Sequence, residues 1–368
     1  MQLKDSLNIE KPSEVKPPSF RFIDLFAGIG GMRIPFDELG GKCVFSSEWD
    51  RFACNTYEVN FGHRPHGDIT KIASKEIGQH EVLLGGFPCQ AFSNAGLKRG
   101  FLDTRGTMFF EIQRILAEWR PKMFLLENVK QLRGHDKGRT LETILAILNG
   151  DAPPMPDDIP MSLEARKSLQ KKLNYAVDFK VLSATEFGVP QRRERVYIVG
   201  FDRDHYGDVE ASEVFANLQE REYATRLADA LEPEGSNQVA QYTISDRLWE
   251  GLIRRMARHE AKGNGFGHKV FGAKDDYCNT ITSRYYKDGR EILIDQSHMG
   301  LNPRRLTPRE CARIQGFPDW FDLSACSDTQ LYRQFGNSVS VPVIRSIANS
   351  MLELSNRLEA VKSKAAVG

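Results

Sequence analysis

Short apolar runs alternate with helical patterns over residues 20–200, and no other feature of the chain limits its possible folds as strongly. Apolar residues recur at spacings of three and four in 107–119 and 140–148, which predicts helices there. The strand candidates are 21–26, 42–47, 81–85, 123–127, 179–183 and 196–201. Strands that alternate with helices form βαβ units, so we predict an α/β fold around a mostly parallel sheet.

The alternation stops after Gly200, which indicates a second, smaller domain. Residues 241–310 carry thirteen basic and nine acidic side chains, although the whole chain has a net charge of only +1. The pattern is helical again from Gln334, with four apolar residues on one face: Val343, Ile347, Met351 and Leu354. We expect a flexible leader over 1–19 and a frayed tail over the last dozen residues.

Membrane and metal sites are not indicated by the sequence. No apolar run approaches the roughly 20 residues of a membrane span, and the first 18 residues lack the apolar core of a signal peptide. The six cysteines include no C-x-x-C pair, so neither a zinc site nor a disulfide framework is expected. We expect a cytoplasmic protein that binds no metal.

A glycine turn follows the first predicted strand and indicates a nucleotide-type site. Residues 22–31 read FIDLFAGIGG, where glycines let the backbone approach a ligand. Glu48 ends the next strand, twenty residues after Gly28, where a ribose hydroxyl partner belongs. Arg33 replaces the third glycine of the dinucleotide fingerprint, which argues against NAD and leaves S-adenosylmethionine. The alternative is a tight turn without a ligand, and Asp68, at a third strand end, could equally be a helix cap.

A candidate nucleophile lies in the loop after the third predicted strand. Residues 85–93 read GGFPCQAFS, which puts Cys89 at the sheet edge where open α/β folds place their chemistry. A thiol attacks as the thiolate, so it needs cations or dipoles nearby. Glu127 ends another strand, and alternation puts Arg193 and Arg195 on one face. Taken singly, Cys89 could be core filler, Glu127 a helix cap and the arginines a solvated charge run. Together they predict a nucleophile, an acid and guanidinium anchors.

The order of these motifs strongly resembles that of the cytosine-5 DNA methyltransferases of bacterial restriction–modification systems. The resemblance covers about residues 20–355 and implies a Rossmann-like methyltransferase fold that uses S-adenosylmethionine. It also implies a discontinuous catalytic domain over 20–200 and 330–358, a target-recognition domain and hinge over 201–329, and a frayed tail over 359–368. The motifs are FIDLFAGIGG (22–31), SEWD (47–50), GDIT (67–70), GFPCQAFS (86–93), ENV (127–129), QRRER (191–195), RRLTPRECARIQGFP (304–318) and QFGNSVSVPV (334–343).

The resemblance implies a covalent mechanism. The Cys89 thiolate would add to carbon 6 of cytosine, while Glu127, protonated or sharing a proton with ring nitrogen 3, would stabilise the charge that develops. Arg195 would fix the base oxygen, and Arg193 the adjacent backbone or carboxylate. Methyl transfer to carbon 5 would precede loss of the carbon 5 proton and elimination of Cys89. The target atom is buried in a stacked duplex, so the base must be flipped out.

The resemblance also assigns the binding residues. It implies that the cofactor is held by Phe26, Ala27, Gly28, Ile29, Gly30, Gly31, Glu48, Trp49, Asp68, Ile69, Pro88, Met108, Asn337, Ser338 and Val339. The DNA-binding residues would be Gln90, Ser93, Lys98, Arg99, Thr280 and Arg284. Residues 90–101, with glycine hinges, would form a closing loop. Ala95 stands where some relatives carry a polar side chain that fills the gap left by the base, so the filling residue stays open.

The region before 304 resembles that of the subgroup methylating sites that begin 5′-CC, such as CCWGG. Thr280 and Ile281 look like the family pair that contacts the backbone of the flipped nucleotide, and Arg284 is a candidate base reader; the alternative is nonspecific phosphate contact. The implied partners are double-stranded DNA, bound as a monomer at the nucleoid, and a functionally paired restriction endonuclease.

Two rival functions remain open on the sequence alone. An RNA (tRNA) cytosine-5 methyltransferase could use the same scaffold, although the domain inserted between the two catalytic parts argues for duplex DNA. A catalytically silent DNA-binding regulator is the other rival, and the intact Cys89, Glu127 and Arg195 argue against it.

Overall fold

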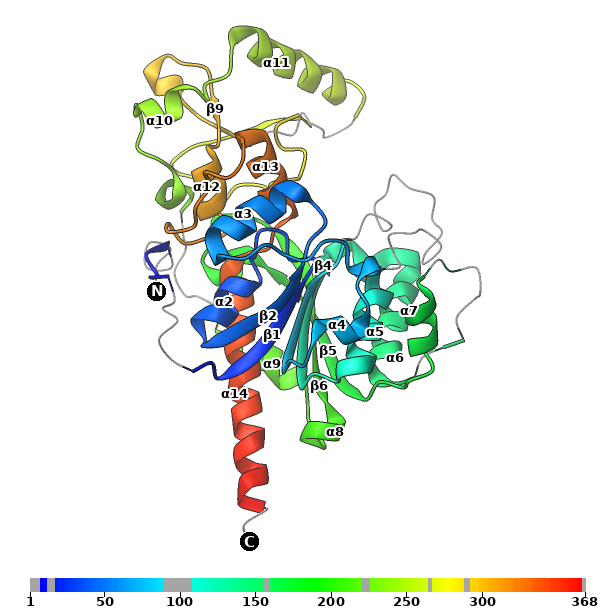
Figure 1. The fold of residues 1–368 in the computed structure, drawn as a ribbon. Helices are drawn as coiled ribbons and strands as arrows, with labels where there is room; N and C mark the ends of the chain where they lie inside the picture. The colour runs from blue at the N-terminus through cyan, green and yellow to red at the C-terminus, as the bar shows by residue number, and fades with distance from the viewer. Residues whose placement is uncertain are drawn as a thin grey trace.

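The computed structural model describes residues 7–11, 17–88, 108–151, 153–154, 159, 161–219, 226–263, 267–287 and 292–365. A central sheet carries helices on both faces, and a second group of elements lies beyond one end of the sheet (Figure 1). This arrangement confirms the predicted α/β class with a second, smaller part.

The sheet has six strands in the order β2-β1-β3-β4-β6-β5. Their bounds are β1 Phe20–Leu25, β2 Gly41–Ser47, β3 Val82–Gly86, β4 Met123–Val129, β5 Tyr175–Ser183 and β6 Glu194–Asp202. The four strands β2, β1, β3 and β4 are parallel, whereas β6 runs antiparallel to both β4 and β5. The mostly parallel sheet is therefore confirmed. The carboxyl ends of the four parallel strands meet at one edge, which is where ligands bind in open α/β sheets.

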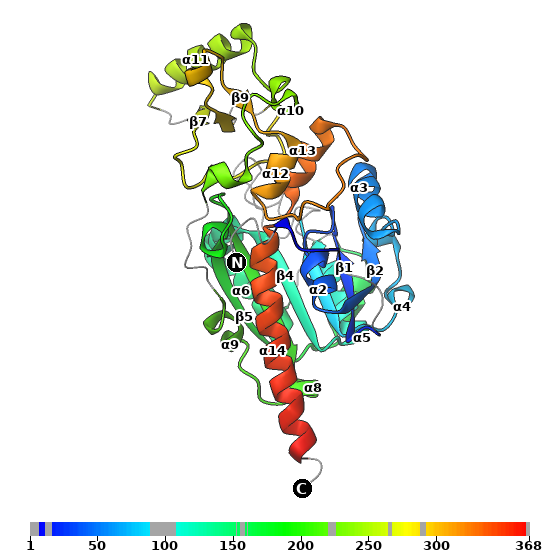
Figure 2. The same ribbon diagram turned by 90° about the vertical axis from the view of Figure 1, so that its left-hand side faces the viewer.

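Helices cover the sheet on both faces. One face carries α2 (Arg33–Glu38), α9 (Ser212–Ala216) and the long α14 (Val341–Ala365), and both α2 and α9 pack on α14 (Figures 1 and 2). The other face carries α5 (Met108–Trp119), α6 (Arg139–Asn149) and α7 (Leu163–Ser168). Each layer buries its own apolar cluster against the sheet, so the sheet edge between them is held rigidly.

The second part is built from short elements around a three-stranded sheet. Figure 2 shows α10, α11, β7 and β9 together at the end of the molecule away from the C-terminus. The remaining bounds are α3 Arg51–Phe61, α4 Ser74–Ile77, α8 Arg203–Tyr206, α10 Asn237–Ala240, α11 Asp246–Glu260, β7 Lys269–Phe271, β8 Ile292–Ile294, β9 Arg304–Arg305, α12 Pro308–Arg313 and α13 Asp328–Asn337. A small cluster of Ile244, Leu252 and Leu293 packs α11 on this sheet.

The described parts of both chain ends pack against the rest of the molecule. Leu7, within the expected leader, is buried in the core, and its carbonyl oxygen accepts a hydrogen bond from the Asp319 amide at 2.8 Å. The expected frayed tail is helical through Ala365, since lysine and alanine favour helix and Glu359 is anchored by Lys122 at 2.8 Å.

The expected division at residue 200 also needs revision. Helix α9 packs on β5 and α14, so the large domain continues past β6 to at least Ala216. The end of the strand–helix alternation after Gly200 suggested a separate domain, because a sequence pattern does not report which surface a short helix covers.

Candidate active site

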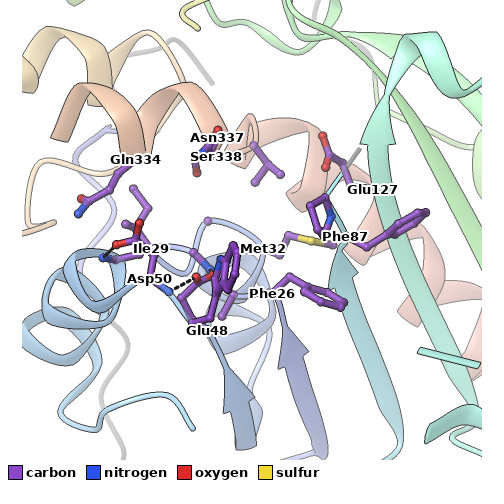
Figure 3. A pocket seen from close by; sticks show the side chains of 18 of the residues that line it. Phe26, Ile29, Met32, Glu48, Asp50, Phe87, Glu127, Gln334, Asn337 and Ser338 are labelled. Carbon is purple, nitrogen blue, oxygen red and sulfur yellow. Dashed lines mark hydrogen bonds between the residues drawn. The ribbon is translucent and has the colours of Figure 1, made fainter. Parts of the chain in front are cut away.

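A cavity of about 960 Å³ opens at the carboxyl ends of β1 to β4. Figure 3 shows Phe26 and Glu48 on one side of it, with Asn337 and Ser338 on the other. The described residues that line it include most of the predicted cofactor set: Phe26, Ala27, Gly28, Ile29, Gly31, Glu48, Trp49, Asp68, Ile69, Pro88, Met108, Asn337, Ser338 and Val339. Segments far apart in sequence therefore converge on one cavity.

The glycine turn after β1 forms the floor of this cavity. Gly28 has a φ of 55°, and a Cβ added there would meet nothing within 4 Å, so its backbone faces open space. Gly31 is crowded instead, because a Cβ would lie 2.9 Å from the side chains of Ser338 and Val339. Gly30 does not line the cavity; its missing side chain makes room for the ring of Phe61. The turn thus both exposes backbone to a ligand and admits the C-terminal segment.

Glu48 at the end of β2 is held in a fixed orientation. One carboxylate oxygen accepts a hydrogen bond from the Gly28 amide at 2.9 Å, and the other accepts one from the Asp50 amide at 2.8 Å (Figure 3). Burial raises the pKa of this carboxyl above its ordinary value. Trp49 beside it is 81% exposed at the cavity rim, where its ring is available to a ligand.

The C-terminal segment closes the cavity from the far end of the chain. Asn337 ends α13, and Ser338 and Val339 follow it against the glycine turn. Two contacts join α13 to α3: Gln334 accepts a hydrogen bond from Thr56 at 3.0 Å, and Arg333 pairs with Asp50 at 3.1 Å. Arg333 and Gln334 also line the cavity, although neither was among the predicted cofactor residues.

Glu127 and Arg195 form an ion pair in the cavity wall. They lie on the neighbouring strands β4 and β6, with Arg195 Nε 3.1 Å from Glu127 Oε1. Burial raises the pKa of the Glu127 carboxyl, while Arg195 and Arg193 oppose this shift. A carboxyl whose protonated form is favoured in this way can give or share a proton.

Arg193 lines the same cavity but is engaged with backbone. Its guanidinium donates to the carbonyl oxygens of Ile281 and Gly336, each at 3.2 Å, and to that of Ser338. Its position next to Glu127 and Arg195 agrees with the predicted shared face. Arg193 therefore ties the second part of the molecule to the C-terminal segment.

The predicted nucleophile lies outside the described residues, as do Gln90, Ser93, Lys98 and Arg99. The structure describes the chain up to Pro88, which lines the cavity, and Cys89 follows it directly. Asn128 donates a hydrogen bond to the Phe87 carbonyl oxygen at 3.2 Å and so fixes the chain two residues before Cys89. This contact explains why an asparagine follows Glu127.

The two predicted DNA-binding residues of the second part lie away from the cavity wall. Thr280 donates its hydroxyl hydrogen to the Arg192 carbonyl oxygen at 2.5 Å. Arg284 is exposed, and the cavity is lined instead by its neighbour Ser283. The backbone around them is packed tightly, since a Cβ on Gly336 would lie 2.2 Å from the Ser283 nitrogen.

Asp24 is a further cavity residue that sequence reasoning missed. It lies in β1, is 1% exposed, and neither carboxylate oxygen has a hydrogen-bond partner among the described residues. Burial raises the pKa of Asp24 to about 8, although Arg33 lowers it. The sequence signal for a functional role was an acidic residue within the apolar run FIDLF.

The described residues include no group of three or more His, Cys, Asp or Glu side chains placed to hold a metal ion. Within the same residues, no helix is both long and apolar enough to cross a bilayer.

Comparison with known proteins decides the family. The profile of the C-5 cytosine-specific DNA methylases matches residues 20–150 and 163–353. The chain belongs to this family. It is a DNA cytosine-5 methyltransferase, and the DNA reading is thereby favoured over the RNA alternative.

Relatives and solved structures agree with this assignment. The chain is similar to the type II methyltransferase M.DsaV of Dactylococcopsis salina, with 50% identity over 93% of this chain and 88% of that protein. Identity to M.HpaII of Haemophilus parainfluenzae is 41%, covering 91% and 89%. The fold is shared with the S. pombe Dnmt2 methyltransferase, at a TM-score of 0.67 and 21% identity over 90% of this chain and 98% of that one.

Proposed function

We propose that the cavity binds S-adenosylmethionine and that Cys89, Glu127 and Arg195 act on a flipped-out cytosine of duplex DNA at its open side. The observation that carries this proposal is the Glu127–Arg195 ion pair, 3.1 Å long, in the wall of a cavity whose other wall is the glycine turn. The chain enters the same cavity at Pro88, one residue before the thiol.

The cavity fits S-adenosylmethionine in three respects. Gly28 leaves open space where a side chain would otherwise stand, Glu48 offers a fixed carboxylate to hydroxyl groups, and Asp24 is a buried carboxyl without a partner among the described residues. The cofactor is a cation that carries a ribose and an ammonium group, so this donor and acceptor set matches it. When bound, S-adenosylmethionine supplies an activated methyl group.

The protein's own groups prepare the base. Adding the Cys89 thiolate to carbon 6 requires that negative charge on the ring be stabilised. Glu127 can donate to ring nitrogen 3, because burial favours its protonated form. Arg195 keeps the carboxyl in place and has further N–H groups for the base oxygen. The two terminal nitrogens of Arg193 donate to three carbonyl oxygens, which supports a role in holding backbone rather than base.

We further propose that the target begins 5′-CC and is read by residues 241–303, with Arg284 as a base reader. Arg284 is exposed and lies four residues after Thr280, which supports its role as a base reader. We also propose that residues 330–358 complete the catalytic domain, because Ser338 and Val339 lie against the glycine turn.

The outward face of α11 offers a surface for phosphates. It carries Arg247, Arg254 and Arg258 at helical spacing around Gly251, where a Cβ would meet nothing within 4 Å. Arg254 pairs only loosely with Glu250, at 3.6 Å on the surface, so its charge remains available. Cations arranged along an open helix face suit the DNA backbone.

The type II relatives lead us to propose that methylation protects the cell's own DNA from a partner endonuclease. We expect a monomer on DNA that acts in the cytoplasm at the nucleoid.

The decisive experiment measures methyl incorporation into duplex DNA and into tRNA, followed by bisulfite sequencing of the product. We expect incorporation into DNA at one short site and none into tRNA. Cys89→Ser should abolish transfer while retaining DNA binding, and DNA carrying 5-fluorocytosine at the target should trap the wild-type protein through Cys89. Trapping through another cysteine, such as the described and buried Cys54 or Cys311, would overturn the assignment.

A further inference from the structure

Arg114 of α5 is almost completely buried, at 2% exposure, in the layer beneath the sheet edge. A guanidinium is costly to bury unless its donors are all satisfied. Here they are. Nε donates to Glu111 at 2.6 Å, one terminal nitrogen donates to Ser74 at 2.7 Å and to Glu164 at 3.3 Å, and the other donates to the Ile69 and Ile72 carbonyl oxygens at 2.7 and 2.9 Å.

Most of these partners belong to one short segment, 69–74, which contains no strand of the sheet. Asp68 directly precedes the segment, and its side chain accepts hydrogen bonds from the Thr70 amide and hydroxyl. The segment ends at Ser74, the first residue of α4. The indole of Trp119, also on α5, donates to the Ser74 carbonyl oxygen at 2.6 Å. Helix α5 therefore holds both ends of this segment, and Glu164 of α7 adds a further contact by accepting a hydrogen bond from the Ser74 amide at 3.1 Å.

The same segment forms part of the cavity wall. Asp68, Ile69 and Thr70 line the cavity, and so does Met108 at the start of α5. The bonds from Arg114 reach the carbonyl of Ile69 itself and that of Ile72, so they fix the backbone that presents these three residues.

We propose that Arg114 is a positioning residue for the cofactor: it sets the wall formed by Asp68, Ile69 and Thr70 without touching the cavity. This inference rests on the proposed binding of S-adenosylmethionine in that cavity. No other side chain of the described residues donates to the Ile69 and Ile72 carbonyls together. Losing the planar guanidinium of Arg114 should therefore weaken cofactor binding more than DNA binding.

The test compares two equally buried polar residues on the same helix. Arg114→Lys keeps a positive charge beside Glu111 but cannot reach Ser74 and both carbonyls at once. Gln113→Leu is the matched control, because Gln113 is 1% exposed and its side chain forms hydrogen bonds with Ser168, away from the cavity wall. Cofactor affinity is measured by calorimetry, and kcat and both KM values by methyl transfer to duplex DNA.

For Arg114→Lys we expect the Kd and KM for S-adenosylmethionine to rise about tenfold, as for a lost set of charged hydrogen bonds. The kcat at saturating cofactor and the KM for DNA should stay within about twofold. Gln113→Leu should lower the melting temperature without changing cofactor affinity. Hydrogen exchange at residues 69–74 should be faster in Arg114→Lys than in the control.

Two results would overturn the inference: unchanged cofactor affinity in Arg114→Lys, or an equal loss of affinity in Gln113→Leu. If Arg114→Lys does not fold, Ser74→Ala removes one acceptor and should weaken cofactor binding in the same direction; wild-type affinity in Ser74→Ala then counts against it. Failure of the wild-type protein to bind S-adenosylmethionine at all would instead refute the proposed function, so the two failures are distinguishable.

Discussion

The Nε atom of Arg195 lies 3.1 Å from Oε1 of Glu127, across the antiparallel pair β4–β6. This one contact joins a motif near residue 127 to a motif near residue 195 and orients the buried carboxyl. Burial raises the pKa of Glu127, whereas the neighbouring Arg195 lowers it.

Glu127→Gln keeps the size of the side chain but removes its exchangeable acid proton. We expect kcat to fall about 10²- to 10³-fold, the scale of a lost transition-state stabiliser, with cofactor affinity unchanged. Burial raises the pKa of Glu127, so the protonated form persists to higher pH than for a free glutamate, and wild-type activity should decline as pH rises through that raised pKa. A pH profile of kcat measures this. A profile for Glu127→Gln with the same alkaline limb would contradict the role.

Glu48→Ala should weaken S-adenosylmethionine binding by about 1–3 kcal/mol, because a fixed charged acceptor is lost. Calorimetry measures the change directly. Glu58→Ala is the control, since Glu58 lies on the neighbouring α3 but pairs with Arg64 at the surface. Equal affinities for wild type and Glu48→Ala would refute the assignment of Glu48 to the cofactor.

Asp24→Asn should make stability less dependent on pH. Burial raises the pKa of Asp24 to about 8 in the folded protein, from an ordinary value of 3.8. Between these values the folded state holds the proton and the unfolded state releases it, so the free energy of unfolding falls as pH rises from about 4 to about 8.

Thermal unfolding at pH 6 and pH 9 tests this linkage. Asp24→Asn should resemble wild type at pH 6 and exceed its stability by about 1–3 kcal/mol at pH 9, since an unpaired buried charge is avoided. A stability difference that is the same at both pH values would show that folded Asp24 is already ionised at pH 6, which would contradict the raised pKa.

Arg284→Ala tests base reading. We expect specificity to relax at one position by about 1–3 kcal/mol, while S-adenosylmethionine affinity stays unchanged. Methylation is compared on the cognate duplex and on duplexes with one base changed. Arg258→Ala on α11 is the comparison variant and should weaken all duplexes alike with a shallower salt dependence. If Arg284→Ala behaves as Arg258→Ala, then Arg284 contacts phosphate.

The sequence predicted those parts of the site that follow from local pattern. Glu48 and Glu127 could be placed at strand ends because apolar runs report where strands stop, and β2 and β4 indeed end at or near them. The direction of β6 could not be predicted, because an apolar run looks the same in a parallel and an antiparallel strand. The ordered position of Leu7 escaped prediction for a related reason: one apolar residue in a polar leader gives no periodic signal.

The burial of Arg114 and Asp24 could not be predicted, because it depends on partners that are distant in sequence. Arg114 reads as an ordinary charged residue on an amphipathic helix, yet its partners come from three segments 3, 40–45 and 50 residues away. Its burial can be known only once α5 is packed against residues 69–74. Asp24 is similar, since its isolation depends on what surrounds β1.

The close contact between Gly31 and Ser338 has a consequence for protein synthesis. A ribosome releases the glycine turn some three hundred residues before the segment that completes the same cavity. The nascent enzyme consequently cannot modify DNA until translation has passed residue 339, and a chain that stops earlier lacks a wall of its cavity.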